Sequence, residues 1–82
     1  METVIGKVIH YYPKISVAAV VLEDHIGKGD RIHIHGPHED LHQFVTSMEL
    51  EHVPIDEAKK GQDIGIRVFE RVHEGDIVLR ED

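Results

Sequence analysis

Short glycine-containing turns, each followed by an apolar segment, are the feature that most constrains the fold of this chain. Residues 26–32 and 72–78 share the pattern aliphatic-x-x-Gly-Asp-x-aliphatic, and residues 60–64 form a looser third copy. Glycine reaches positive φ without steric cost, and aspartate hydrogen-bonds its own backbone, so a Gly-Asp pair predicts a tight turn. Because an apolar strand-length segment follows each turn, the three copies predict an antiparallel β-structure.

The clearest alternation lies in residues 31–35, where Ile32 and Ile34 point to one face and the polar side chains to the other. Other strand-length segments occupy residues 4–12, 15–22, 41–51, 64–69 and 77–80, and residues 56–61 are predicted to form a single helical turn. No segment has the periodicity of a long amphipathic helix. The sequence therefore predicts an all-β domain, a small closed antiparallel β-barrel of about six strands.

Composition limits the classes of protein that the chain can belong to. The 82 residues predict one stand-alone domain, residues 1–82, and the absence of cysteine excludes disulfides, thiolate metal ligands and cysteine nucleophiles. A small secreted domain usually carries disulfides, and the N-terminus lacks a signal-peptide pattern, so we expect a cytoplasmic protein without a membrane span. The net charge of −7 resides entirely in residues 36–82, which disfavours broad contact with nucleic acid.

The arrangement of turns and strands resembles the second, β-barrel domain of translational GTPases of the elongation factor Tu type. The resemblance extends over residues 6–8, 17–22, 26–34, 43–48, 56–66 and 72–78, which is nearly the whole chain. Residues 29–37, with the pattern Gly-Asp-x-Ile-x-Ile-x-Gly-Pro, are also similar to the C-terminal barrel of collagenase-like peptidases. In both families the resemblance implies an accessory binding module and not the catalytic part.

The chain lacks the phosphate-binding loop of the translational GTPases. No G-x-x-x-x-G-K-[ST] motif is present, so GTP binding by this chain is not expected. Ser16 and Ser47 lack the context of a catalytic serine, and the carboxylates have no recognisable catalytic spacing. We therefore predict that the chain is not an enzyme and uses no cofactor.

Histidine is the unusual residue type, with eight in the chain. Two of the four histidines in residues 33–42 share a strand face, a spacing that can place two imidazoles on one metal ion. The alternative is that they are solvent-facing residues of an exposed hairpin. The candidate metal ligands are His33, His35, His38 and His42.

Basic and aromatic residues of the N-terminal part form a candidate binding surface. Aromatic rings can stack on bases or ligands and cations can contact phosphate, although surface tyrosines and lysines at strand edges are also common without a partner. These candidates are Lys7, His10, Tyr11, Tyr12, Lys14, Lys28 and Arg31. The sequence thus predicts a translation-factor-like binding or adaptor module for a protein partner or for RNA or the ribosome, with a histidine-based metal-binding protein as the alternative. It predicts neither the oligomeric state nor which partner is bound.

Overall fold

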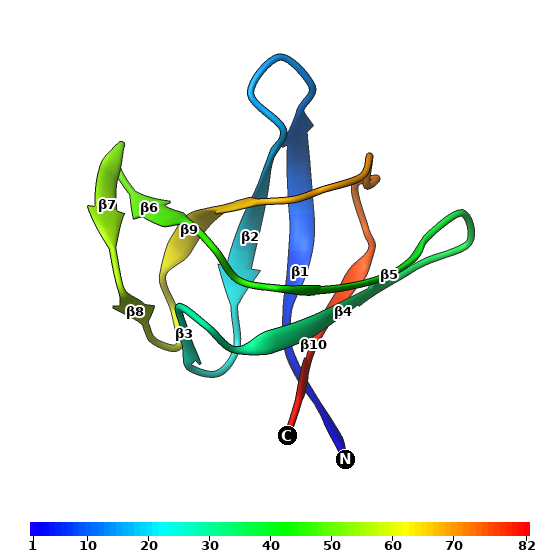
Figure 1. The fold of residues 1–82 in the computed structure, drawn as a ribbon, viewed down its shortest axis with the longest axis horizontal. Coiled ribbons are helices and arrows are strands. Elements are labelled where there is room, and N and C mark those ends of the chain that lie inside the picture. The colour runs from blue at the N-terminus through cyan, green and yellow to red at the C-terminus, as the bar shows by residue number, and fades with distance from the viewer.

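The computed structural model describes residues 1–82 and contains ten strands and no helix (Figure 1). The strands are β1 (Glu2–Tyr12), β2 (Val17–Leu22), β3 (Ile26–Gly27), β4 (Arg31–His35), β5 (Asp40–Phe44), β6 (Met48–Leu50), β7 (Val53–Ile55), β8 (Glu57–Ala58), β9 (Asp63–Arg67) and β10 (Ile77–Glu81). Eight of them form one antiparallel sheet in the order β5-β4-β10-β1-β2-β9-β6-β7, and β3 pairs with β8 in a second, two-stranded sheet.

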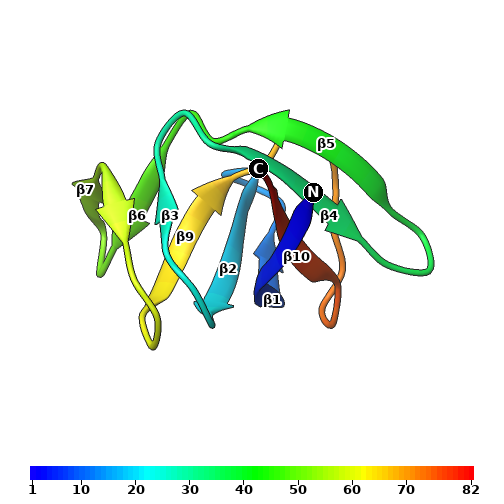
Figure 2. The same cartoon turned by 90° about the horizontal axis from the view of Figure 1, so that it is seen from below.

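The prediction of a closed barrel is wrong, although the all-β class is confirmed. The eight-stranded sheet begins at β5 and ends at β7, and these two edge strands are not hydrogen-bonded to each other. The sheet is strongly curled, as the two perpendicular views show (Figures 1 and 2). One face therefore surrounds the core although the ladder is open.

The sheet stays open because the predicted strand over residues 41–51 is interrupted. Residues 45–47 carry the chain from β5, at one edge, to β6, which pairs with β9 near the other edge. Val45 bonds to the turn before β4, where its N–H donates to the Asp30 carbonyl and its own carbonyl accepts from Gly29 N–H, each at 2.8 Å. The backbone groups of Val45 thus bond to the turn before β4 and do not continue the β-ladder.

The side chain of Gln43 bridges part of the gap between the two edges. Its Nε2 donates to the Arg67 carbonyl at 2.9 Å, and its Oε1 accepts from Phe69 N–H at 2.9 Å. Gln43 is buried, so these bonds replace strand pairing between β5 and the segment that follows β9.

The buried face alternates along each strand of the sheet as the period of two requires. In β2, for example, Ala18, Val20 and Leu22 are buried while the residues between them are half-exposed. Gly6 lies at the β-bulge where β1 shifts register against β10, and a glycine inside an apolar strand is typical of such a bulge. A Cβ there would lie 2.6 Å from the Val21 carbonyl oxygen, so the close approach of β2 requires glycine.

The three glycine turns have one common geometry, with ends at Gly27 and Asp30, at Lys59 and Gln62, and at His73 and Asp76. In each turn the backbone N–H of the last residue donates to the carbonyl of the first, at 3.0, 3.2 and 3.1 Å. The side-chain oxygen of the last residue accepts from the N–H of the first, at 2.8, 2.9 and 2.9 Å. The glycines between them have φ of 95°, 91° and 94°. The predicted turns are confirmed, but residues 56–61 contain β8 and no helical turn.

Both chain ends lie side by side at one end of the molecule (Figure 1). Glu2 pairs with Glu81 at the start of the β1–β10 ladder, and Asp82 N–H donates to the Met1 carbonyl at 2.9 Å. The structure contains no helix that could cross a lipid bilayer.

Candidate functional site

Four residues from four strands form a histidine–carboxylate cluster on the outer face of the sheet. We call this set, Glu2, His33, His42 and Glu81, the outer-face cluster. His33 Nδ1 lies 2.7 Å from Glu2 Oε2, and His42 Nδ1 lies 2.6 Å from Glu81 Oε1. The two imidazole rings are stacked, with centroids 4.0 Å apart. One ligand atom from each of the four residues lies within 4.8 Å of the others, a set that could hold a metal ion.

Hydrogen bonds between the histidines and carboxylates can also stabilise the outer-face cluster without a metal ion. His33 Nε2 lies 2.5 Å from Asp40 Oδ1, so carboxylates flank both ring nitrogens of His33. Burial lowers the pKa of His33, but its hydrogen bonds with Asp40 and Glu2 outweigh burial and hold the pKa above its ordinary value. The hydrogen bond with His33 in turn lowers the pKa of Asp40. The two flanking carboxylates thus stabilise the protonated form of His33 relative to a histidine in water.

The structure brings together His33, His35 and His42, and places His38 elsewhere. His35 lies beside His33 on the same strand face, and its Nδ1 is 3.8 Å from Asp40 Oδ1. His38 lies in the turn after β4, with its ring centroid 5.4 Å from that of His73. The sequence pattern did not identify Glu2 and Glu81, because only the pairing of β1 with β10, and of β10 with β4, brings the two ends of the chain to this hairpin.

A second cluster lies where the β4–β5 turn meets the turn before β10. Glu39 Oε1 contacts His73 Nδ1, and ligand atoms of Glu39, His73 and Asp76 lie within 4.8 Å of one another. We call these three residues the Glu39 cluster. The Glu39 side chain is 7% exposed, and its Oε2 is buried without a hydrogen-bond partner. Burial and the neighbouring Asp76 carboxylate raise the pKa of Glu39, although His73 lowers it.

The predicted basic and aromatic residues lie on several elements, and among them the His10 and Tyr12 rings are 4.4 Å apart. Tyr11 is half-buried against the core, with the Arg71 guanidinium 5.8 Å from the centre of its ring, and His10 Nδ1 lies 3.2 Å from Glu74 Oε2. Arg31 pairs with Glu81 at 2.5 Å. Lys7 lies in the middle of β1, Tyr12 and Lys14 lie at the β1–β2 hairpin, and Lys28 lies in the turn before β4.

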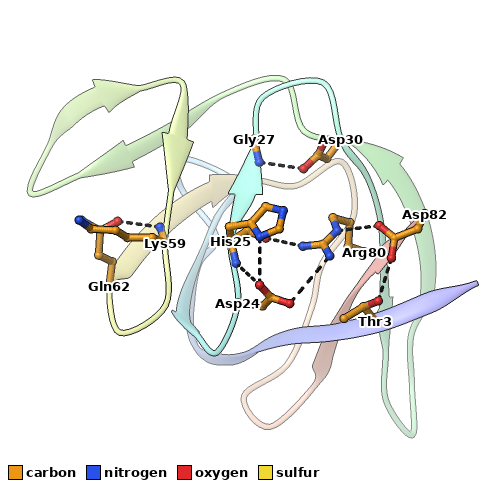
Figure 3. A network of polar contacts seen from close by, with 9 residues as sticks. All are labelled: Thr3, Asp24, His25, Gly27, Asp30, Lys59, Gln62, Arg80 and Asp82. Carbon is orange, nitrogen blue, oxygen red and sulfur yellow. Dashed lines mark hydrogen bonds and ion pairs between the residues drawn. The ribbon is translucent and has the colours of Figure 1, made fainter.

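A surface cleft of about 630 Å³ lies beside the β3–β8 pair and is lined by the first two glycine turns and Arg80. Figure 3 shows that the Arg80 guanidinium already has partners. Its Nε donates to Asp82 Oδ1 and its Nη1 donates to the His25 carbonyl, each at 2.7 Å, and Asp24 Oδ2 lies 3.8 Å from Nη2. This cation is therefore used within the fold and is not free for an anionic ligand.

An apolar groove of about 350 Å³ lies between the β1–β2 hairpin and the β6–β9 pair. Tyr12, Ile15 and Ile64 contribute its apolar lining, and Glu49, Glu51 and Asp63 contribute acidic groups. Ile15 is 57% exposed. The groove combines an apolar floor with negative charge.

Ser16 and Ser47 lack the contacts of a catalytic serine. Neither Ser16 nor Ser47 has a side-chain hydrogen bond to a histidine, and Ser16 occupies a turn with φ of 56°. A serine nucleophile requires a base within hydrogen-bonding distance.

Comparisons with known proteins relate the chain to one part of a peptidase. It is 37% identical over 75 residues to an uncharacterised protease of Methanocaldococcus jannaschii, a match that covers 90% of this chain and 18% of that protease. The structure superposes with a TM-score of 0.89 on the C-terminal domain of a Geobacillus thermoleovorans protein described as a U32 peptidase. That match has 23% identity and covers 96% of this chain and 92% of the other, and the selenomethionine form matches equally well. No family model matches the chain.

These findings support one of the two resemblances that the sequence suggested. The likeness to the C-terminal domain of collagenase-like peptidases is supported, and the description of the chain as a translation-factor-like module is wrong. At 23% identity, the structural likeness establishes the fold. The chain spans about a fifth of the length of the protease it matches.

Proposed function

We propose that this chain is a non-catalytic, peptidase-associated binding module that recognises a protein partner through the apolar groove. The observation that carries the proposal is an exposed apolar floor, with Tyr12 and Ile15, beside three carboxylates. The similarity to the C-terminal domain of a peptidase and to a fifth of a protease supports an accessory role. The fitting partner is a protein segment that presents an apolar side chain flanked by lysine or arginine, because the acidic rim favours positive charge.

Substitution of Ile15 provides the test. The tag-free chain and its Ile15→Asp variant would be immobilised and exposed to lysate of the source organism, with and without nuclease. The Phe44→Asp variant is the matched control, because Phe44 is also 57% exposed but lies on β5, outside the groove. We expect a nuclease-resistant protein that Ile15→Asp fails to recover and Phe44→Asp retains. The proposal would be contradicted if Ile15→Asp recovers the partner as well as the wild type does, or if the partner is lost on nuclease treatment.

The catalytic part of the proposal is tested with the isolated chain. We expect no hydrolysis of a mixed peptide library by the wild-type protein above that of a Ser16→Ala/Ser47→Ala double variant. Hydrolysis that the double variant loses would show that the chain is itself a peptidase.

Metal binding by the outer-face cluster is a second candidate function, favoured by the convergence of two imidazoles and two carboxylates from four strands. Nitrogen and oxygen ligands of this kind suit Zn²⁺ and other divalent transition-metal ions. The double variant His33→Asn/His42→Asn should lose one equivalent of Zn²⁺ in isothermal titration calorimetry. The exposed His52, which lies outside the cluster, provides the control substitution His52→Asn. Unchanged stoichiometry in the double variant would exclude the site.

A further inference from the structure

The Glu39 cluster differs from the outer-face cluster because its carboxylates are buried. Asp76 is 1% exposed and Glu39 is 7% exposed at the side chain, whereas His73 remains 45% exposed. Two buried carboxylates that face each other cannot both remain charged without a neutralising partner. The cluster thus has two buried oxygen donors and one imidazole accessible from solvent.

The three glycine turns provide an internal comparison. Asp30, Gln62 and Asp76 occupy the same position in their turns, and each accepts a hydrogen bond from the N–H three residues earlier. The turn therefore accounts for the hydrogen bond that Asp76 Oδ2 accepts, and the turn can form without Glu39. Only Asp76 is faced by a second buried acid, so the carboxylate pair is an addition to the turn.

The turn after β4 is packed directly on the Asp76 carboxylate. A Cβ at Gly36 would lie 2.0 Å from Asp76 Oδ1, so only glycine allows this approach. Gly36 N–H donates to the Glu39 carbonyl at 3.0 Å, which closes the turn and directs Glu39 toward Asp76. Glu39 Oε1 contacts His73, and the buried Oε2 has no partner. An unpaired buried carboxylate oxygen is costly and indicates a missing donor or cation.

We propose that Glu39, His73 and Asp76 bind one divalent transition-metal ion of the zinc class. Their ligand atoms lie within 4.8 Å of one another, and Zn²⁺ accepts both imidazole nitrogens and carboxylate oxygens as ligands. His38, whose ring lies 5.4 Å from that of His73, is not a member of this group of three. The hydrogen bond from His73 N–H to Asp76 Oδ2 orients the second carboxylate. A single proton shared by Glu39 and Asp76 is the competing occupant.

The test uses tag-free, chelator-treated chain in the His33→Asn/His42→Asn background, which removes the outer-face cluster. Zn²⁺ is titrated calorimetrically, and we expect one equivalent to bind. Glu39→Gln should weaken binding at least about 100-fold, because loss of a ligand costs more than loss of a supporting hydrogen bond. Glu74→Gln is the matched control: Glu74 is adjacent to His73 but 68% exposed and outside the cluster, and we expect binding within about twofold of the background protein.

Two further measurements separate the metal ion from a proton and from a folding defect. Glu39→Gln retains an amide that can donate to Asp76, so without metal its melting temperature should match that of the background protein. Zn²⁺ should raise the melting temperature of the background protein and leave that of Glu39→Gln unchanged. His73→Asn, at a half-exposed position, should also lose the isotherm. Bound Co²⁺ should give a visible spectrum that both variants lack. Absence of saturable Zn²⁺ binding, or an isotherm that Glu39→Gln and His73→Asn leave unchanged, would overturn the proposal.

Discussion

The buried amide of Gln43 provides a sharp test of how the open sheet is held together. The substitution Gln43→Leu keeps the size of the side chain and removes its hydrogen bonds. Phe69 N–H and the Arg67 carbonyl then lose partners at 2.9 Å, and leucine excludes water from both. Each unsatisfied group costs about 1–2 kcal/mol, so we expect a loss of about 2–4 kcal/mol in the free energy of unfolding.

A loss of that size is a large fraction of the stability of a domain this small. Each 1 kcal/mol lowers the melting temperature by about 4–8 °C at this chain length, so Gln43→Leu should melt at least about 8 °C below the wild type. Urea titration followed by circular dichroism, with fixed m-value, gives the free energy directly.

Gln62→Leu is the control, because Gln62 Oε1 also accepts a backbone N–H, from Lys59 at 2.9 Å, but at an exposed turn. Water replaces that bond, so we expect a loss of about 0.5 kcal/mol. If Gln43→Leu costs no more than Gln62→Leu, the amide does not substitute for strand pairing and the reasoning is refuted.

Gly36→Ala should lower the free energy of unfolding by about 2–4 kcal/mol, because its Cβ would displace the buried Asp76 carboxylate. Gly27→Ala, whose Cβ finds no atom nearer than 3.7 Å, should be near neutral in the same denaturant titration. Hydrogen bonds from Arg80 and Thr3 lower the pKa of Asp82, so the stability this carboxylate contributes is present above about pH 4 and is lost as the pH falls through its lowered pKa. Asp82→Asn should therefore flatten the acid limb of the melting-temperature profile; an unchanged limb would contradict this.

Local patterns predicted the strands and turns well because local physics determines them. The alternation of Ile32 and Ile34 and the three glycine turns needed no tertiary information. The prediction of a closed barrel was wrong because closure depends on which groups the backbone of Val45 bonds to. The pattern of apolar residues in 41–51 does not indicate that the strand is interrupted at Val45.

The candidate sites were predicted in part for the same reason. His33, His35 and His42 share a hairpin, so a local pattern found them. Glu2 and Glu81 reach them only through the pairing of the first and last strands. Glu39 meets Asp76 because two distant turns pack together. The copy of the glycine turn in residues 72–78 marked Asp76 as a turn residue and gave no sign of its partner.

The position of the two chain ends has a mechanical consequence. β1 and β10 are antiparallel neighbours, and the first pair of their ladder, Glu2 with Glu81, lies next to both termini. A force that pulls the termini apart therefore loads one hydrogen-bonded pair at a time and peels the two strands open like a zipper. The domain should yield to such a pull at low force. A pull between the β1–β2 hairpin and the C-terminus would instead load the β1–β10 ladder along its length, and we expect it to meet greater resistance.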